Sequence, residues 1–595
     1  MTEQRTAPFR MPERLFAELA AGGGSAEAVA FLEQGERARR LLLLRTLLDH
    51  LVALPTPLTP AAEAWRVLKE AARRAPEPVE ALLLAPATGT WIAHMLRRVH
   101  GTASGPPLWA EAGRLNALAV VASLRAGTET VLRVPLTDGA LPLPGLGTAR
   151  LPDGADGPAT GRAGTRAGEL TLTGPDRAGR RATLVCRPAP EPVGAAVSAE
   201  TPHWSPLRTL TCASAAGPVP IPLEDLDPYR DLDNPVPPAR LDADEALAWQ
   251  RLFDGAAALL ADPPPGPAAD GAGTAGDAGP RTPGTWLPGR LDPARIKALV
   301  PWGRTAAQPP PPPDVRVSAS SGDAYGAMVV ARPAGALALA ETLVHEFQHS
   351  KLAALIHLFP LADDDRAERY YAPWRPDPRH LTGLLHGAYA FTGVAGFWRD
   401  RLAHPDHGPA AAYHFALRRT QTRLVVRTLL TSGRLTEAGH GLVSGLARTL
   451  DGWLRVPVDA AALARARTAA VLHRTEWRLR NVAPPTGPPG RAAAGPLRFR
   501  ADRTAWSDVR THAFATRPAS PRTPDEHLAA GDPAAALDGY TAALDREPGD
   551  PGLLAGWIVA RAALTGGRAA RRMLARPELL PHPHTGRIHV PAAEG

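Results

Sequence analysis

Two histidines one helical turn apart are the residues of this chain best suited to chemistry. They belong to His345-Glu346-Phe347-Gln348-His349, an HExxH pentapeptide. In a helix, His345 and His349 lie one above the other on the same face, where both imidazoles can bind one divalent metal ion. Glu346 lies about 100° around the helix from His345, close enough to reach a metal-bound water. The spacing therefore predicts a metal site with two histidine ligands and an adjacent catalytic carboxylate.

The sequence around the motif predicts a helix that can position these groups. The segment 334–359 contains no proline and, apart from Gly335, no glycine, and Pro333 suits a first helical turn. Apolar residues recur at helical spacing along it, which indicates one face turned to a core. These residues are Leu337, Leu339, Leu343, Val344, Phe347, Leu352, Leu355 and Ile356.

The residues after the motif exclude one zinc-peptidase class and give no support to another. The extended form of the motif needs Gly three residues and His six residues after the second histidine, where this chain has Leu352 and Leu355. The other large class takes a Glu from a downstream helix, usually in an ExxxD motif, and no such motif occurs in about the next 40 residues. The nearest acids, Asp363 to Asp365 and Glu368, stand in a polar loop that we expect to be solvated.

A third ligand is expected at His386. This histidine falls within an otherwise apolar stretch, between Gly383 and Gly387, and an isolated histidine in such surroundings needs a partner. The alternative interpretation is a hydrogen-bonded core histidine. Glu368 and His380 are the next candidates for the ligand position.

Several segments together resemble one family, the HEXXH-motif peptide-modification proteins that occur beside ribosomally made peptide precursors in bacteria. The resemblance covers approximately residues 200–480. It rests on the pentapeptide and on five further segments: Ser350-Lys351-Leu352, Trp374-Arg375, Leu384-Leu385-His386-Gly387, Gly322-Asp323-Ala324-Tyr325-Gly326 and Asp227-Pro228-Tyr229-Arg230.

The resemblance implies an Fe(II)- and 2-oxoglutarate-dependent peptide β-hydroxylase. Its substrate would be a precursor peptide, with another peptide-modifying enzyme as a further candidate partner. Two histidines and one further ligand leave open positions, which suits non-haem iron. The far carboxylate of 2-oxoglutarate needs a cation, for which Arg375 is the first candidate and Arg379 and Lys351 are the next.

Two other functions stay open at this point. In a zinc metallopeptidase, Glu346 would deprotonate the metal-bound water. A non-catalytic protein would bind a precursor peptide or a partner enzyme and would hold no stoichiometric metal.

The amino-acid composition argues against several binding partners and cellular locations for this protein. The 595 residues carry a net charge of +8, but only three are lysines, and the arginines are scattered among acids, which argues against nucleic-acid binding. No apolar run is long enough to span a membrane, and the polar segment 1–12 lacks the apolar core of a secretory signal. The two cysteines, Cys186 and Cys212, provide no disulfide framework and fit the cytoplasm.

The length suggests two to four domains of an α+β, mostly α, fold. We expect a helical metal-binding core with a small β region and helical N- and C-terminal parts. The expected segments are an N-terminal helical region (1–125), a β-rich region (126–215), a helical connector (216–262), a Pro/Gly linker (263–291), the catalytic core (292–482), a second linker (483–522) and a C-terminal helical appendage (523–595).

Overall fold

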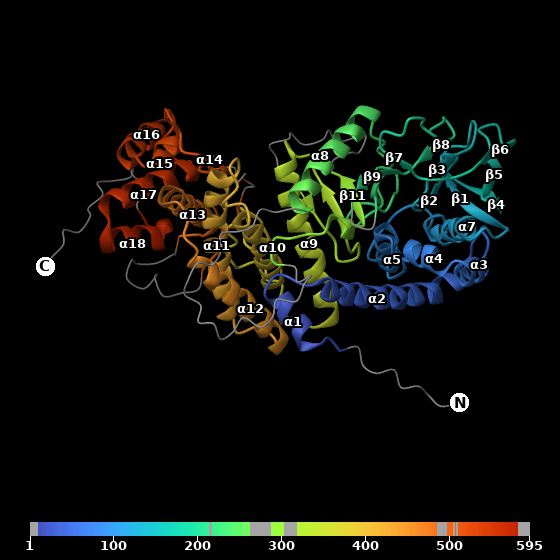
Figure 1. Cartoon of the computed structure of the whole chain (residues 1–595), viewed down its shortest axis with the longest axis horizontal. Coiled ribbons are helices and arrows are strands. Elements are labelled where there is room, and N and C mark those ends of the chain that lie inside the picture. Colours follow the sequence, from blue (N-terminus) through green and yellow to red (C-terminus); the bar gives the residue numbers. More distant parts are fainter. Residues whose placement is uncertain are drawn as a thin grey trace. The chain divides into compact units, whose positions relative to one another are not determined.

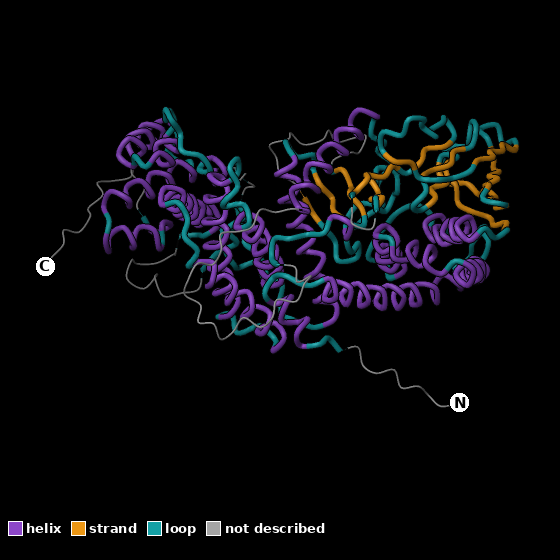
Figure 2. The backbone as a smooth tube through the Cα atoms, viewed as in Figure 1, coloured by secondary structure: helices purple, strands orange, loops and turns teal. Residues whose placement is uncertain are grey.

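The computed structural model describes residues 10–213, 217–261, 287–302, 318–484, 497–503, 506 and 510–580. Helix outweighs strand in these ranges, so the protein is α+β and mostly α, as expected (Figure 2). The chain divides into two compact units. We call Glu27–Asp262 with Leu291–Phe359 the sheet unit, and Met1–Ala26 with Pro263–Arg290 and Pro360–Gly595 the helical unit.

The sheet unit begins with helices that cover its first sheet. Helix α7 is buried along almost its whole length and packs against α3, α4 and strands of that sheet, so it forms the centre of this core (Figure 1). A proline starts both α4 and α5, where its missing N–H costs nothing. The helices are α2 (Ala26–Val52), α3 (Ala61–Arg74), α4 (Pro76–Leu84), α5 (Pro86–Val99), α6 (Leu108–Ala112) and α7 (Arg114–Ala126).

The first sheet has seven antiparallel strands in the order β6-β5-β4-β1-β2-β3-β8. Leu132, Val134 and Leu136 alternate along β1 and are buried, so one face of this sheet joins the core around α7. The strands are β1 (Thr130–Thr137), β2 (Ala140–Leu143), β3 (Gly147–Arg150), β4 (Pro158–Arg166), β5 (Glu169–Pro175), β6 (Arg181–Cys186) and β8 (Trp204–Pro206).

The second sheet is mixed and has six strands in the order β12-β13-β11-β10-β9-β7. Strands β10, β11 and β13 run parallel, and β12 joins the edge antiparallel to β13. Helices α8 (Ala243–Ala261) and α9 (Ala336–Leu358) pack against each other and against this sheet. The strands are β7 (Glu191–Pro192), β9 (Arg208–Cys212), β10 (Val219–Leu223), β11 (Ala298–Pro301), β12 (Ser318–Ala319) and β13 (Ala327–Val330), and a short 3₁₀ turn, η1 (Pro293–Arg295), precedes β11.

The β structure is more extensive than the small β region expected at 126–215. Strand β13 lies within the segment 325–331, which the sequence predicts to be extended. Strand β11 is a four-residue, fully buried strand, which gives no alternating pattern that a sequence could reveal. Strand β10 contains Pro220 and Pro222, which usually argue against a strand. The HExxH helix therefore rests on a sheet and not on helices alone.

The helical unit is built around α10, α11 and α13. Helix α11 packs against α10, α12 and α13, and the short helix α1 packs against α12. Helices α15 and α17 pack on α13, so the C-terminal helices share a core with α11 and α13. The elements are α1 (Glu13–Ala20), α10 (Leu381–Arg399), α11 (Gly408–Leu430), α12 (Glu437–Leu454), α13 (Ala460–Asn481), α14 (Arg510–Ala513), α15 (Pro524–Ala530), α16 (Pro533–Arg546), α17 (Pro551–Thr565), α18 (Gly567–Ala575) and η2 (Pro577–Leu579).

The expected segment boundaries remain predictions. The division into two units falls at Pro360, inside the segment 292–482 that was expected to be one core. Most of the linker 263–291 and much of 483–522 lie outside the described residues. In the described part of the chain, no single helix is long and apolar enough to cross a membrane. Within the same residues, α4 and α5 meet this length and composition test only when they are taken together, and they are bent by 55° relative to each other.

Candidate metal centre

Helix α9 carries the HExxH motif and is positioned by the second sheet of the sheet unit. Alanine and leucine, strong helix formers, dominate its sequence, and it ends just before Pro360. Its expected apolar positions are mostly buried, and the helix packs against β12, β13 and α8. At its far end, His357 Nδ1 lies 2.7 Å from Glu36 Oε1 of α2, which fixes the C-terminal turn.

His345 and His349 converge as the spacing predicted. Their Nε2 atoms are 3.1 Å apart and their ring centroids 4.7 Å apart, with the rings nearly perpendicular. Metal–nitrogen bonds of about 2.0–2.1 Å place two ligand nitrogens of one ion about 3 Å apart. At the observed separation the two imidazoles can share either a proton or a metal ion. The His345 side chain is 21% exposed, so an ion could enter.

Glu346 is the buried carboxylate of the motif. Its side chain is 1% exposed, and its Oε1 lies 4.0 Å from His345 Nε2. Its Oε2 is buried and has no hydrogen-bond partner among the residues that the structure describes. A buried carboxylate oxygen without a donor is costly. The atom is therefore poised for a donor that a metal-bound water or a substrate N–H would supply.

Lys351 lies two residues beyond His349 and is also buried. Its ammonium stands 6.0 Å from the centroid of the Phe347 ring. Burial lowers the pKa of Lys351 to about 7, so that near neutrality both forms of its amine are populated. The next residue toward the motif, Ser350, accepts a hydrogen bond from the backbone N–H of Gly326 at 3.4 Å, which ties α9 to the loop before β13.

His386 belongs to α10 of the helical unit, whereas His345 and His349 belong to the sheet unit. The neighbouring Gly387 makes room for Trp374, because a Cβ at Gly387 would lie 2.3 Å from the indole ring. Trp374 also stacks on Phe391 of the same helix, with ring centroids 4.5 Å apart. The structure thus brings together two of the segments that the sequence singled out, Trp374-Arg375 and Leu384–Gly387.

The segment that carries Arg375 is held by hydrogen bonds from the helices around it. Gln421 donates to the carbonyl of Pro373 at 3.0 Å, and Asn481 donates to the carbonyl of Pro376 at 2.8 Å. The Arg375 side chain itself is 48% exposed and pairs with Asp377 at 2.9 Å. Arg379 contacts the same aspartate at 3.3 Å. Arg375 is therefore exposed on a backbone held by hydrogen bonds, whereas the Arg379 side chain is 27% exposed and its Nε is buried.

The alternative third ligands differ in their surroundings. Glu368 is exposed in the loop between α9 and α10. His380 caps α10, and its Nδ1 lies 2.6 Å from Asp364 Oδ2. A carboxylate on the second ring nitrogen is the arrangement that orients metal-ligating histidines. His380 thus remains the named alternative to His386.

Within the described residues, no set of three or more His, Cys, Asp or Glu side chains is gathered in a way that could hold a metal ion. The pair of histidines on α9 is therefore the part of the predicted site that the structure assembles. The third ligand stays a prediction.

Comparisons with known proteins leave the family open. The chain matches no protein-family model, and no curated protein is significantly similar to it. The resemblance described from the motifs therefore stays a prediction that only biochemistry can decide.

Proposed function

We propose that the chain is an iron- and 2-oxoglutarate-dependent hydroxylase that acts on a ribosomally made peptide in the cytoplasm. The observation that carries the proposal is the convergence of His345 and His349, with Nε2 atoms 3.1 Å apart on one face of α9. The sequence resemblance supplies the reaction class. His386 is the proposed third ligand.

The donor set suits this chemistry. Three neutral imidazoles would leave the full charge of a divalent ion in place, which favours an anionic co-substrate. Iron held by three side chains keeps positions open and supplies oxygen-activation chemistry. The role of the protein is to hold the ligands, exclude water and orient the peptide.

The proposed net reaction balances without a further reductant. A peptide C–H bond, dioxygen and 2-oxoglutarate give a peptide alcohol, succinate and carbon dioxide. One oxygen atom enters the peptide and the other enters succinate. The decarboxylation supplies two electrons and the C–H bond supplies the other two.

Arg375 is the proposed partner of the far carboxylate of 2-oxoglutarate. Its planar guanidinium can bind a carboxylate with two hydrogen bonds. Its present ion pair with Asp377 is partly exposed, with side-chain exposures of 48% and 39%. Exposed pairs contribute little to stability, so exchanging Asp377 for the co-substrate is inexpensive.

The second candidate is a zinc metallopeptidase, and the environment of Glu346 favours it. A peptidase needs a general base beside the metal-bound water. The buried Oε2 of Glu346 has no hydrogen-bond partner among the described residues and lies next to the His345–His349 pair, which supports this second candidate.

We predict that Glu346→Gln separates the two reactions. The protein is co-expressed with the peptide encoded beside its gene, and the peptide is examined by mass spectrometry. A hydroxylase adds one oxygen atom and forms succinate in equal amount, and Glu346→Gln retains part of this activity because the amide needs only to accept or donate a hydrogen bond. A peptidase cleaves the peptide, and the same variant is inactive because the amide cannot take up a proton.

The metal requirement gives an independent control. Turnover with Fe(II) and oxygen but not with Zn(II) supports the hydroxylase. Cleavage of the peptide with zinc in the absence of 2-oxoglutarate would contradict the hydroxylase assignment and support the peptidase. A protein that binds the peptide but never changes its mass would contradict both.

We predict that Arg375→Ala raises the KM for 2-oxoglutarate by at least about tenfold, because a carboxylate loses a charge-assisted, bidentate partner. Arg375→Lys should recover only part of this loss, since lysine offers a point charge in place of a planar fork. Arg369→Ala is the matched control, because Arg369 is an arginine of the same unit that pairs with Asp365. An unchanged KM in Arg375→Ala would move the role to Arg379 and then to Lys351.

A further inference from the structure

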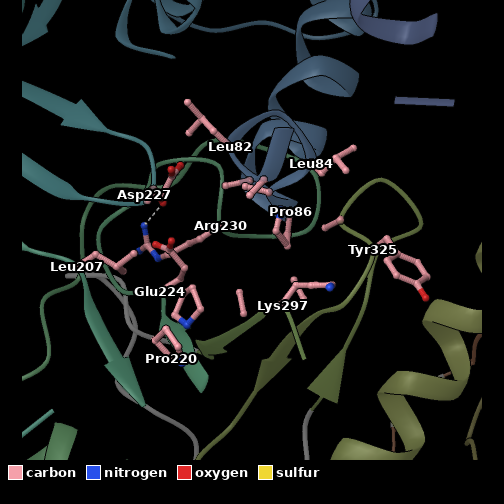
Figure 3. Close-up of a pocket in the computed structure, with 18 of the residues that line it drawn as sticks. Leu82, Leu84, Pro86, Leu207, Pro220, Glu224, Asp227, Arg230, Lys297 and Tyr325 are labelled. Atoms are coloured by element: carbon pink, nitrogen blue, oxygen red, sulfur yellow. Dashed lines mark hydrogen bonds between the residues drawn. The ribbon is translucent and has the colours of Figure 1, made fainter. Parts of the chain in front are cut away.

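A large cavity among the described residues lies within the sheet unit and contains none of the HExxH residues. Its volume is about 1090 Å³. Helices α2, α4 and α5 line one side, and strands β9, β10 and β11 with the segments around 224–230 and 324–327 line the other (Figure 3). This size is at the upper end of ordinary ligand sites.

Much of the wall is apolar. Leucine and proline side chains from the helices and from β10 face the space, as Figure 3 shows for several of them. The main apolar contributors are Leu82, Leu84, Pro86, Leu207, Pro220 and Pro222. Such a wall suits the hydrocarbon part of a ligand.

Glu224, just after β10, is the unusual polar group of this cavity. The residue is 8% exposed, and its backbone N–H donates to Leu299 at 2.8 Å. Among the described residues, none donates a hydrogen bond to its carboxyl group or forms an ion pair with it. In Figure 3, Glu224 lies near Asp227 and Arg230 at one end of the cavity.

The carboxylates on either side of Glu224 in sequence are already paired. Asp225 accepts from Arg240 at 3.1 Å and from the backbone of Leu241 at 2.9 Å. Asp227 forms a bidentate pair with Arg114, at 3.0 and 2.7 Å. Glu224 is thus the buried carboxyl of this group that still lacks a partner.

The basic groups of the cavity wall have partners of their own. Arg230 donates to the carbonyls of Asp227 at 2.8 Å and Pro237 at 2.6 Å. Arg40 donates to two backbone carbonyls, and Lys297 lies 3.3 Å from Glu33. These cations therefore do not neutralise Glu224.

The charges around Glu224 also indicate that its carboxylate would be stabilised by a bound cation. Burial, followed by the nearby charges of Asp227 and Asp225, raises the pKa of Glu224 to about 8, against the opposing effect of Arg114 and Arg230. The negative neighbours thus outweigh the positive ones at this position. A bound cation would stabilise the ionised carboxylate.

We propose that this cavity binds an organic cation, an ammonium group on an apolar stem, which pairs with Glu224 while its stem lies on the leucine and proline wall. The ammonium can come from a lysine side chain of a peptide or from a free alkylamine. The site is distinct from the HExxH residues and does not depend on their metal or on their reaction.

Calorimetric titration of the full chain with matched probes tests this site. The peptide probe is N-acetyl-Leu-Lys-Leu-amide, and its neutral control carries norleucine in place of lysine. The amine probe is hexylamine, with hexanol as its neutral control. We expect at least one cationic probe to bind about tenfold or more tightly than its neutral control, because a charge-assisted hydrogen bond to a buried carboxylate is lost in the control.

Two variants assign the effect to one side chain. Glu224→Gln should abolish the preference for the cation, whereas Glu77→Gln, which changes an exposed carboxylate lining the same cavity, should preserve it. Tight binding of the peptide with weak binding of hexylamine identifies a lysine-bearing peptide as the ligand, and the reverse identifies a free amine. Equal affinity for cationic and neutral probes, retention of the preference in Glu224→Gln, or no binding of either cationic probe at millimolar concentration would overturn the proposal.

A measurement of thermal stability tests whether the Glu224→Gln variant is folded. The raised pKa means that the folded wild type holds a proton that the unfolded chain has lost, so its stability falls as the pH rises from about 4.5 to 8. The Glu224→Gln variant does not show this fall in stability, because its side chain has no proton to release. Its thermal midpoint at pH 8.5 should therefore equal or exceed that of the wild type.

Discussion

His345→Ala should reduce the bound iron or zinc of the purified protein to background. The two Nε2 atoms at 3.1 Å are the nitrogen pair that can hold one ion, and the single imidazole left in the motif cannot replace that pair. His349→Ala should have the same effect. Elemental analysis of protein loaded with metal and then desalted measures the loss, and the far-ultraviolet circular dichroism should remain that of the wild type.

His440→Ala is the matched control, because this histidine is exposed on α12. Its metal content should not change. In the same assay His386→Ala should weaken metal binding by about 10–100-fold or more, as loss of a ligand or its support does. Wild-type affinity in His386→Ala would direct the search to His380 and then Glu368. Undiminished metal in His345→Ala would contradict the site itself.

Asp227→Ala should lower the free energy of unfolding of the sheet unit by about 3–5 kcal/mol, because it leaves the charge of Arg114 buried without its partner. Arg114 and Asp227 are 6% and 7% exposed at their side chains and are joined at 2.7 Å. Asp227 also accepts from the backbone N–H of Tyr229 at 2.9 Å. Urea denaturation followed by fluorescence measures the change.

Asp156→Ala provides the comparison on the surface. Its pair with Arg177 has side chains 75% and 70% exposed, and breaking it should cause no measurable change. A double variant with Arg114→Met and Asp227→Leu should recover much of the loss, since the charge is removed with its partner. Equal stability of Asp227→Ala and wild type would mean that water reaches Arg114.

Local patterns in the sequence were reliable guides to individual elements. The sequence predicts a helix at 61–74 and, from a short apolar run, a strand at 181–186, and these coincide with α3 and β6. Asp242, with Glu245 three residues further on, predicts a helix N-cap, and the Asp242 carboxylate accepts from the backbone of Glu245 at 2.7 Å. By contrast, the sequence Pro86-Ala87-Thr88-Gly89 predicts a turn before a helix that starts at Trp91, but this segment is the start of α5, because proline is also favoured at a first helical turn.

Features that depend on residues far apart in the sequence could not be predicted from local sequence patterns. The partner of Asp227 is Arg114, 113 residues away, and no local pattern links them. The cavity at Glu224 needs the same long-range packing of helices from the first hundred residues against β10 and β11. In the candidate site, the meeting of His345 and His349 follows from helical periodicity alone. The contact of Trp374 with Gly387 was not predicted. A glycine in an apolar helix leaves room for a large side chain from another segment, so Gly387 could have suggested such a contact.

Helix α1 has a consequence for biosynthesis. Tyr389 donates to the carbonyl of Leu19 at 2.9 Å, and Thr449 donates to the carbonyl of Ala21 at 3.1 Å, so α1 docks on partners that are synthesised much later. The two residues of the second contact are 428 positions apart. At about 5–20 residues per second, α1 waits roughly 20–90 s for its binding surface. During that time the side chains of Leu15 and Leu19, which are buried in the folded protein, lack the surface that later covers them.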